Sequence, residues 1–332
     1  LLEGTPEEAA ALVEYANIEH DYDIRYWSIG NEPSLYATMD RAEEYDTEYF
    51  NTRWRAFAEA MLAVDPDIQL LGPEIHQFAV EPEARPKDAE GRDWMREFLL
   101  ANGDMVDVVT FHRYPFPQNP ADAPPSIDDL RDNSQEWDEL IPALRDLIAE
   151  TTDRELPIGV TEVNSNWSSA AGGDTTPDSF YNAIWWADVL GRLVEQQVEI
   201  VAHFALQSPA SMGGWGLLAR YEVRPTYYVY QLYQHFGETL IFTACDDPDL
   251  SIYGAVREDG ALTLMVVNLG PEPRNYPLHL AKGTPTGEAE VWRLDAEHNA
   301  EQIAPQTLSE AIVVTLPAQS VTLYVVPGQS DK

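Results

Sequence analysis

The chain has 332 residues, of which 44% are hydrophobic and 11% aromatic, so it contains enough apolar material for a large core. It carries 57 acidic and only 20 basic residues, which gives a formal net charge of −37 at pH 7. A surface of this sign repels nucleic acid and anionic membranes, so we expect neither as a partner. No run of about 18 apolar residues is present, and the sequence therefore predicts no membrane-spanning helix.

The acidic excess has two explanations that the sequence leaves open. One is solubility combined with a composition poor in lysine, and the other is adaptation to high salt, which screens self-repulsion. Cys245 is the sole cysteine, so no intrachain disulfide can form. The chain starts at Leu1 without Met or a signal peptide, and we expect a fragment or a processed chain. The oligomeric state stays open.

Residues 1–238 alternate short apolar runs with longer amphipathic segments. Thr5, Pro6 and Glu8 predict a capped helix start, and this helix should reach about Asn17. Further helices are expected at about 46–64, 92–101, 126–151, 177–197 and 225–236. Strands are expected at 25–29, 68–71, 106–111, 156–161 and 200–206.

Short apolar strands that alternate with long helices are typical of a parallel α/β sheet covered by helices. A closed (β/α)8 TIM-type barrel needs eight strands, and the sequence supplies five of them. We therefore predict that residues 1–238 form a catalytic barrel portion that is incomplete at its N-terminus, with strands four to eight present.

The pattern changes from residue 239 onward. Short apolar runs separated by Pro and Gly follow at 250–256, 262–269, 276–280, 289–294, 312–316 and 321–326. Residues 258–260 (Glu-Asp-Gly) lie between the first two runs and predict a hairpin turn. Several short strands at this spacing predict a C-terminal β-sandwich domain over residues 239–332.

In βα barrels, the reacting groups lie at the carboxyl ends of the strands. The polar residues that end the five predicted strands are Asn31, Glu32, Glu74, His112, Tyr114, Glu162 and Gln207. Two glutamates on strands that face each other across a barrel mouth can lie about 5–5.5 Å apart. That separation suits an acid and a nucleophile that act on one glycosidic bond.

Several of these strand ends match the motifs of one enzyme group. Residues 26–33 (YWSIGNEP) resemble the fourth-strand motif of the retaining (β/α)8 glycoside hydrolases of clan A. Residues 161–165 (TEVNS) resemble its strand-seven nucleophile motif, and residues 111–115 (FHRYP) resemble strand six. Trp215 and Gly216 follow strand eight, where such enzymes often place an aromatic residue. The resemblance covers essentially the whole chain and is strongest to families 39, 51 and 79, with a weaker echo of family 44.

The resemblance implies a role for each matching residue. Glu32 would be the catalytic acid/base and Glu162 the nucleophile. Asn31 would bind the sugar 2-hydroxyl, and Tyr114, or else His112, would hold Glu162 in place. The remaining substrate-binding candidates are Trp167 and Trp215, which would stack on sugar faces, and Gln207 at the end of the last strand.

These assignments have structural alternatives. His112 alone is more often a structural hydrogen-bonding histidine, Trp167 equally fits a surface loop, and Glu74 equally fits a substrate contact or a solvated or packing role. The histidines show no metal-ligand spacing, and no Gly-rich phosphate loop is present. We therefore expect neither a metal nor a cofactor.

The resemblance implies retaining hydrolysis of O-glycosidic bonds in poly- or oligosaccharides, with a carbohydrate substrate as the partner. An arabinofuranosidase or xylosidase is the first expectation. An endo-β-glucanase or a β-glucuronidase is the alternative, and Arg113 or Arg220 could then pair with a uronic acid. A non-catalytic carbohydrate-binding relative or an inactive fragment is a further alternative. Enzymes that degrade polysaccharides are commonly exported, which favours an extracellular location.

Overall fold

The computed structural model describes residues 2–37, 45–119, 121–209 and 213–328. The chain divides into two compact units. The first consists of residues 1–114, 138–163 and 196–203, and the second of residues 115–137, 164–195 and 204–332.

The first unit is built on a parallel sheet of five strands in the order β1-β2-β3-β4-β5. The strands are β1 (Tyr26–Ser28), β2 (Gln69–Ile75), β3 (Val108–Arg113), β4 (Ile158–Val163) and β5 (Ile200–His203). This confirms the predicted half-barrel of parallel strands. Buried branched residues such as Leu70, Val109 and Val160 make the strands apolar on both faces, as a covered parallel sheet requires.

Two strands run further than the apolar pattern predicted. β2 continues past Leu71 to Ile75, and β4 continues past Thr161 to Val163. The ladder shows irregularities between Pro73 and Ile75 and between Phe111 and His112. Such irregularities re-aim side chains near the end of a strand, so the polar residues there need not follow simple alternation.

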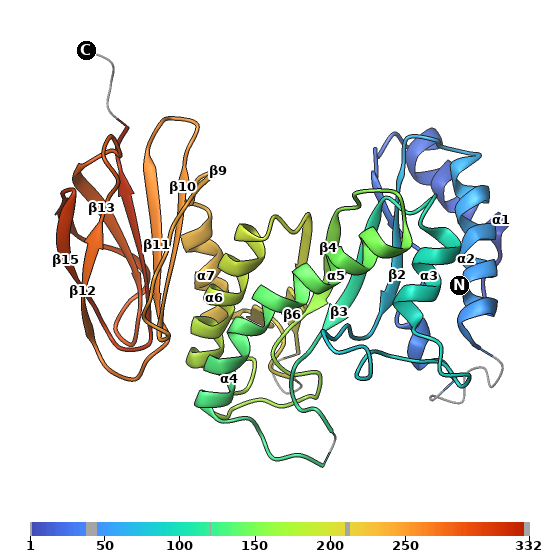
Figure 1. Ribbon diagram of the computed structural model, residues 1–332, viewed down its shortest axis with the longest axis horizontal. Coiled ribbons are helices and arrows are strands. Elements are labelled where there is room, and N and C mark those ends of the chain that lie inside the picture. The colour runs from blue at the N-terminus through green and yellow to red at the C-terminus, as the bar shows by residue number, and fades with distance from the viewer. Residues whose placement is uncertain (1, 38–44, 120, 210–212, 329–332) are drawn as a thin grey trace. The chain divides into compact units, whose positions relative to one another are not determined.

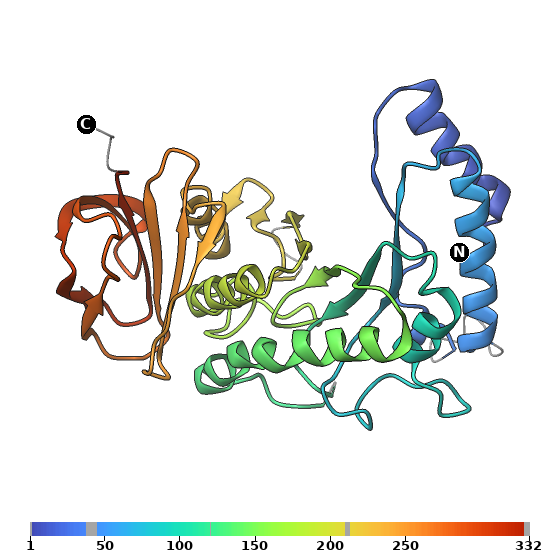
Figure 2. The same ribbon diagram turned by 45° about the horizontal axis from the view of Figure 1, so that its top comes forward.

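Helices cover this sheet, and Figures 1 and 2 show α1, α2 and α3 side by side. The helices of the unit are α1 (Pro6–Val13), which continues as a π-helix (Glu14–Glu19), α2 (Thr47–Leu62), α3 (Trp94–Asn102) and α5 (Trp137–Thr151). The predicted capping box of Thr5 and Glu8 at α1 is confirmed. Trp54 of α2 and Phe98 of α3 meet edge to face at 5.0 Å. A Cβ on Gly72 would lie 2.8 Å from both rings, so only glycine lets β2 approach this closely.

The helix predicted over residues 126–151 is divided, which corrects the prediction. It consists of α4 (Ile127–Asn133), a 3-10 turn (Ser134–Glu136) and α5. The buried Ser134 Oγ donates a hydrogen bond to the carbonyl of Arg131 at 2.9 Å. A serine that bonds back to the preceding turn competes with regular helix geometry, which explains the break.

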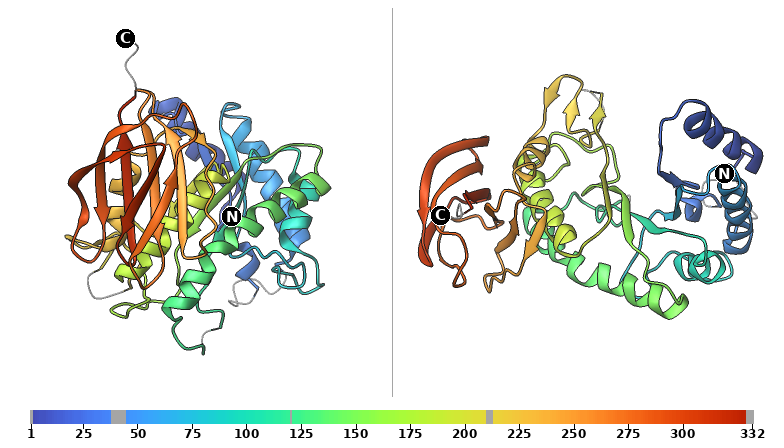
Figure 3. Two further views of the ribbon diagram at one scale, coloured as in Figure 1. Left: turned by 60° about the vertical axis from the view of Figure 1, so that its left-hand side comes forward. Right: turned by 90° about the horizontal axis from the view of Figure 1, so that it is seen from above.

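The second unit contains an antiparallel sheet of six strands in the order β14-β13-β16-β11-β10-β9, and a pair β12-β15. The bounds are β9 (Thr239–Ile241), β10 (Leu250–Val256), β11 (Leu262–Asn268), β12 (Arg274–His279), β13 (Gly287–Leu294), β14 (Asn299–Leu308), β15 (Ala311–Leu316) and β16 (Ser320–Val326). Figure 3 shows these orange to red strands as twisted layers. One buried apolar cluster contains Leu278 and Leu316 from the pair and Leu264 and Tyr324 from the larger sheet.

The β-rich character predicted from residue 239 onward is thus confirmed, but the short β9 was missed, and so was β14. Its sequence, NAEQIAPQTL, holds few apolar residues and a proline, and most of its side chains are not buried. Periodicity carries little signal for a strand of this kind.

Two helices, α6 (Phe180–Glu195) and α7 (Pro225–Tyr233), lie beside these strands in Figure 1. The buried Asp188 of α6 accepts a hydrogen bond from Tyr253 of β10 at 2.6 Å and pairs with Arg192 at 2.9 Å. The hydrogen bond from Tyr253 connects α6 to the six-stranded sheet, and Arg192 balances the buried charge of Asp188.

The strand predicted over residues 200–206 ends earlier than expected. β5 stops at His203, and Gln207 belongs instead to β6 (Gln207–Ser208). β6 lies in a small separate sheet with β7 (Leu218–Ala219) and β8 (Glu222–Val223). Gln207 therefore does not end a strand of the parallel sheet, which corrects that prediction.

Candidate active site

The ends of β1, β3 and β4 bring the two predicted glutamates together. Glu32 follows β1, and Glu162 lies near the end of β4. The His112 Nδ1 atom of β3 lies 3.1 Å from Glu32 Oε1 and 3.2 Å from Glu162 Oε2. One carboxylate oxygen of each glutamate and one ring nitrogen of His112 all lie within 4.8 Å of one another. The pair is therefore close enough to act on a single bond.

The two glutamates differ in exposure from the groups beneath them. The side chains of Glu32 and Glu162 are 25% and 22% exposed, whereas that of His112 is 3% exposed. A substrate can therefore reach the two carboxylates, while His112 contacts them from the protein side.

Tyr114 contacts Glu162, as the resemblance implied. Its hydroxyl donates a short hydrogen bond to Glu162 Oε1. Burial, and then the hydrogen bond and charge of Glu162, raise the pKa of Tyr114 well above its ordinary value. The phenol therefore stays protonated and remains a donor to the carboxylate at any physiological pH.

His112 lies among three carboxylates. Its Nδ1 faces Glu32 and Glu162, and its Nε2 lies 3.3 Å from Glu74 Oε2. Burial alone would lower the pKa of His112, but the hydrogen bonds to Glu32 and Glu74 and the charges of Glu162 and Glu74 outweigh burial and raise the pKa to about 9. The imidazole is thus a cation at neutral pH, with a donor on each side of the ring.

Glu74 is the residue that the sequence left undecided. It is only 2% exposed, which excludes the solvated role considered above. Its carboxylate accepts hydrogen bonds from Ser28 Oγ at 2.5 Å and, at short range, from Thr161 Oγ1. The sequence did offer one signal for a buried Glu74. A Glu that ends a fully apolar strand can be buried only where several hydrogen-bond donors face its carboxylate.

The two predicted tryptophans lie in the second unit. Trp167 is 42% exposed, and its indole N–H donates to the carbonyl of Pro117 at 2.6 Å. The indole N–H of Trp215 donates to the carbonyl of Asn166 at 2.8 Å. Both rings are therefore held in one orientation, and their contact with a sugar stays a prediction.

Asn31 and Gln207 complete the predicted set. Asn31 is exposed beside Glu32. The side-chain amide of Gln207 donates to the carbonyl of Arg220 at 2.7 Å, within the second unit. Neither the exposure of Asn31 nor the hydrogen bond of Gln207 decides whether these residues bind substrate, so both roles stay predictions.

Within the described ranges, Glu32, His112 and Glu162 also form the one set of side chains close enough to share a metal ion. The hydrogen bond of His112 to Glu32 and its ion pair with Glu162 already account for this convergence. The geometry gives no separate reason to place an ion there.

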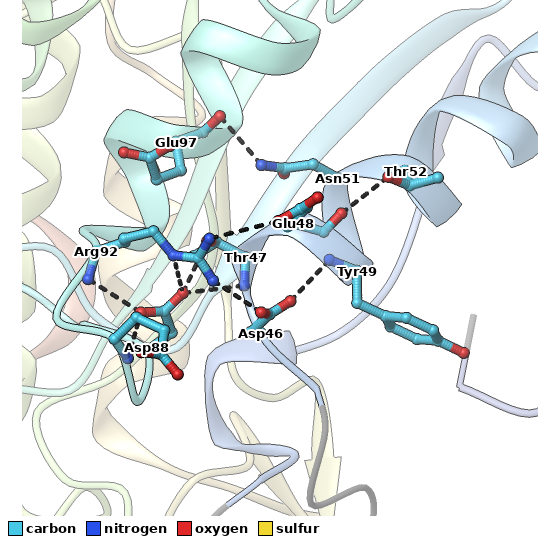
Figure 4. A network of polar contacts seen from close by, with 10 residues as sticks. Asp46, Thr47, Glu48, Tyr49, Asn51, Thr52, Asp88, Arg92 and Glu97 are labelled. Atoms are coloured by element: carbon cyan, nitrogen blue, oxygen red, sulfur yellow. Dashed lines mark hydrogen bonds and ion pairs between the residues drawn. The ribbon is translucent and has the colours of Figure 1, made fainter.

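A cavity of about 510 Å³ lies between α2 and α3 and contains none of the predicted residues. Figure 4 shows the network at its edge, where Arg92 pairs with Asp88 at 2.8 Å, Asp46 at 2.7 Å and Glu48 at 3.7 Å. Asp88 also accepts from Thr47 Oγ1 at 2.8 Å. These charges are satisfied within the protein, so the network serves to anchor the start of α2.

No protein-family model matches the chain. Solved structures resemble it over nearly its whole length, and three of them are named here. CelM2, a bifunctional glucanase-xylanase from a metagenome library, has a TM-score of 0.76 and 22% identity, and the match covers 98% of this chain and 68% of that chain. The family 44 endoglucanase Cel44A from Clostridium thermocellum has a TM-score of 0.75 and 18% identity, with 97% of this chain and 70% of that chain covered. An α-L-arabinofuranosidase from Thermotoga maritima has a TM-score of 0.74 and 18% identity, with 98% of this chain and 74% of that chain covered.

The chain has the fold of these glycoside hydrolases. The predicted resemblance to clan A is confirmed, and the structures represent families 44 and 51. Among curated proteins, mouse heparanase is 24% identical over 290 residues, which gives weaker support to family 79. That match covers 81% of this chain, and the chain spans about half the length (49%) of this relative. None of the helices within the described ranges is long and apolar enough to cross a lipid bilayer.

Proposed function

We propose that this protein is a retaining glycoside hydrolase in which Glu162 is the nucleophile and Glu32 the acid/base. The observation that carries the proposal is the separation of the two carboxylates, whose nearest ligand oxygens lie within 4.8 Å. Retaining enzymes hold their carboxyl groups about 5–5.5 Å apart, whereas inverting enzymes need about 6.5–9.5 Å to admit a water molecule. All the similar proteins named above are glycosidases, which supports the same reaction class.

The proposed reaction has two steps. In the first, Glu162 attacks the anomeric carbon while Glu32 gives its proton to the leaving oxygen, and a glycosyl ester forms on Glu162. In the second, Glu32 removes a proton from water, and the resulting oxygen attacks the anomeric carbon and releases Glu162. Tyr114 donates to Glu162 Oε1 and so leaves Oε2 for the attack or for His112.

The remaining substrate contacts are part of the proposal. Asn31 would hydrogen-bond the sugar 2-hydroxyl, and Trp167 and Trp215 would offer aromatic faces to sugar rings. Gln207 would bind a hydroxyl group. A pentoside, arabinofuranoside or xyloside, is the proposed substrate, in agreement with the arabinofuranosidase and glucanase-xylanase among the similar structures. The endoglucanase and heparanase keep a β-glucan or a β-glucuronide as the alternative.

The proposed architecture places the parallel sheet as strands four to eight of a (β/α)8 barrel over residues 1–238. Residues 239–332 would form a separate β-sandwich domain. The five parallel strands, the two antiparallel sheets with one shared cluster, and the coverage of 68–74% of the similar chains support this reading.

The test is chemical rescue. Glu162→Ala should abolish hydrolysis of aryl glycosides, and added azide should restore activity with a glycosyl azide of inverted configuration. Glu32→Ala should be rescued to a glycosyl azide of retained configuration. Glu139→Ala, an exposed glutamate of α5, is the matched control and should keep full activity. Full activity of the Glu162→Ala variant would refute the assignment, and a panel of aryl glycosides measured on the same samples identifies the glycone.

A further inference from the structure

Glu74 is a buried carboxylate that connects four strands of the parallel sheet. It comes from β2 and accepts hydrogen bonds from Ser28 of β1 and Thr161 of β4. The same carboxylate lies 3.3 Å from His112 Nε2 of β3. Its side chain is 3% exposed, so no substrate and little water can reach it. A charge in such a place is costly and persists only where its partners stabilise it.

The backbone of Glu74 also holds Glu32. The carbonyl of Glu74 accepts a hydrogen bond from the amide N–H of Glu32 at 2.8 Å. Both residues have left-handed backbone conformations, with φ of 58° for Glu74 and 48° for Glu32. A non-glycine residue in this region is strained, and such residues tend to occur at functional sites. This hydrogen bond and the two left-handed conformations together fix the backbone from which both glutamate side chains project.

The link from Glu74 to the reacting pair runs through one ring. His112 Nε2 faces Glu74, and Nδ1 faces Glu32 and Glu162 at 3.1 and 3.2 Å. A neutral imidazole carries one N–H and would turn a lone pair toward one of these carboxylates. A doubly protonated His112 carries an N–H at each nitrogen, so it can donate to Glu74 on one side and to the Glu32–Glu162 pair on the other.

We propose that Glu74 is a positioning residue for the hydrolysis proposed above: it keeps His112 doubly protonated, so that the ring donates Nδ1–H to the Glu32–Glu162 pair. The effect of Glu74 on hydrolysis rests on the proposed function, whereas its effect on the protonation of His112 does not. Glu74 touches no substrate and acts through His112.

The charged and titratable groups that face His112 agree with this role. They are Glu32 after β1, Glu74 of β2, Glu162 of β4 and His76 just beyond β2. Tyr114 beyond β3 contacts Glu162. Burial lowers the pKa of His76, so that second imidazole is neutral and does not compete for the carboxylates. Tyr114 stays neutral as well. His112 is thus the cation between Glu74 and the Glu32–Glu162 pair.

The role makes a direct prediction for His112. Without the charge of Glu74, Nε2–H loses its carboxylate partner in a buried place, and the protonated ring is destabilised. His112 should then lose a proton within the working pH range, and the hydrogen bond to the two glutamates should be lost with it. Ser28 offers a matched comparison, because removing its hydroxyl takes one hydrogen bond from Glu74 but leaves the carboxylate charge.

The experiment is an NMR titration of protein labelled with ¹⁵N-histidine, with His112→Gln used to assign the ring signals. In the wild-type protein, both ring nitrogens of His112 should be protonated at pH 7.5. In Glu74→Gln, the pKa of His112 should fall by at least about one unit, whereas Ser28→Ala should change it by less than half of that shift. Glu74→Asp, which restores the charge, should recover most of the shift.

Two results would overturn the inference. One is an unchanged titration of His112 in Glu74→Gln. The other is a neutral His112 in the wild-type protein at pH 7.5, a measurement that needs only the wild-type protein and His112→Gln for assignment, so it stands even if Glu74→Gln does not fold.

The functional half is tested by the pH profile of kcat/KM. In Glu74→Gln, the alkaline limb should move to lower pH by about the shift seen for His112, with kcat reduced and KM little changed. In Ser28→Ala, which keeps the charge of Glu74, the alkaline limb should stay at its wild-type pH. A role of Glu74 in structure alone would likewise leave the limb of Glu74→Gln unmoved. An intact pH profile in Glu74→Gln would contradict the positioning role while leaving the glycosidase function standing. Absence of any glycoside hydrolysis in the wild-type protein would refute that function and leave the NMR result to decide the structural part.

Discussion

The parallel sheet of the first unit and the antiparallel sheets of the second bury different kinds of side chain. At the ends of β1 to β4, Glu74 and His112 are each 2% exposed and lie against two further glutamates. The cluster shared by β10 to β16 is instead formed by Leu, Val, Ile, Ala and Tyr, with Leu316 fully buried. Buried charge costs free energy that apolar packing does not. The charged cluster of the first unit lies where we propose chemistry, whereas the apolar cluster of the second unit serves stability.

The largest expected effect breaks the chemistry while leaving the fold intact. Glu32→Ala should lower kcat/KM by about 10²–10⁴-fold for substrates whose leaving group needs a proton. The loss should be small for 2,4-dinitrophenyl glycosides, because this leaving group departs as an anion. Steady-state kinetics on a series of aryl glycosides measures the difference. An equal loss for every leaving group would contradict the acid role of Glu32.

The next effect concerns the apolar cluster of the second unit. Leu316→Ala should lower the free energy of unfolding by about 2–5 kcal/mol, because it leaves a cavity in a fully buried place. Urea denaturation measures this loss. Val313→Ala on the same strand is the control, since Val313 is 60% exposed and should change stability little. The titration of His112 should be the same in both variants, and a shift in either would mean that the two regions are not independent.

A third prediction concerns pH and the charged site. The pKa of His112 is raised to about 9, so its ion pairs stabilise the folded protein below the ordinary histidine value of about 6.5. This contribution is lost as the pH rises through about 9, and it amounts to on the order of 3 kcal/mol. The free energy of unfolding of the wild-type protein should therefore exceed that of His112→Gln most strongly near pH 6. The difference should fade by pH 10, and a difference that grows with pH would contradict the assigned charge.

The smallest effect is local to α1. Thr5→Ala removes the hydroxyl that accepts from the Glu8 amide at 3.2 Å and should cost about 1 kcal/mol in the first unit. Thermal unfolding followed by circular dichroism measures it, and Thr5→Ser, which keeps the hydroxyl, is the control. A loss as large as that of Leu316→Ala would mean that the cap supports more than its own helix.

The apolar pattern predicted the five parallel strands and most antiparallel strands, because period and length report burial directly. It missed β14, where exposed polar residues alternate without a clear apolar face. It also extended the last parallel strand to residue 206, since Phe204 and Leu206 continue the apolar run but are 38% and 69% exposed. Apolar character alone did not distinguish a buried strand from an exposed segment.

The convergence of Glu32 and Glu162 was predictable from the sequence, but the buried groups that contact them were not. Glu32 and Glu162 stand at strand ends with recognisable neighbours, and their meeting follows from the parallel topology. The convergence of Ser28, Thr161 and His112 on Glu74 depends on which way each side chain points near two irregularities in the sheet. That information is three-dimensional, and strand alternation does not contain it.

The most direct test is to trap the glycosyl-enzyme. The protein is incubated with a 2-deoxy-2-fluoroglycoside that carries a good leaving group, of the glycone identified by the aryl glycoside panel, and its peptides are analysed by mass spectrometry. We predict one sugar adduct per chain, on Glu162. An adduct on another residue would contradict the pairing of Glu32 and Glu162. So would rapid hydrolysis of the fluoroglycoside to a product of inverted configuration, with no adduct on the protein.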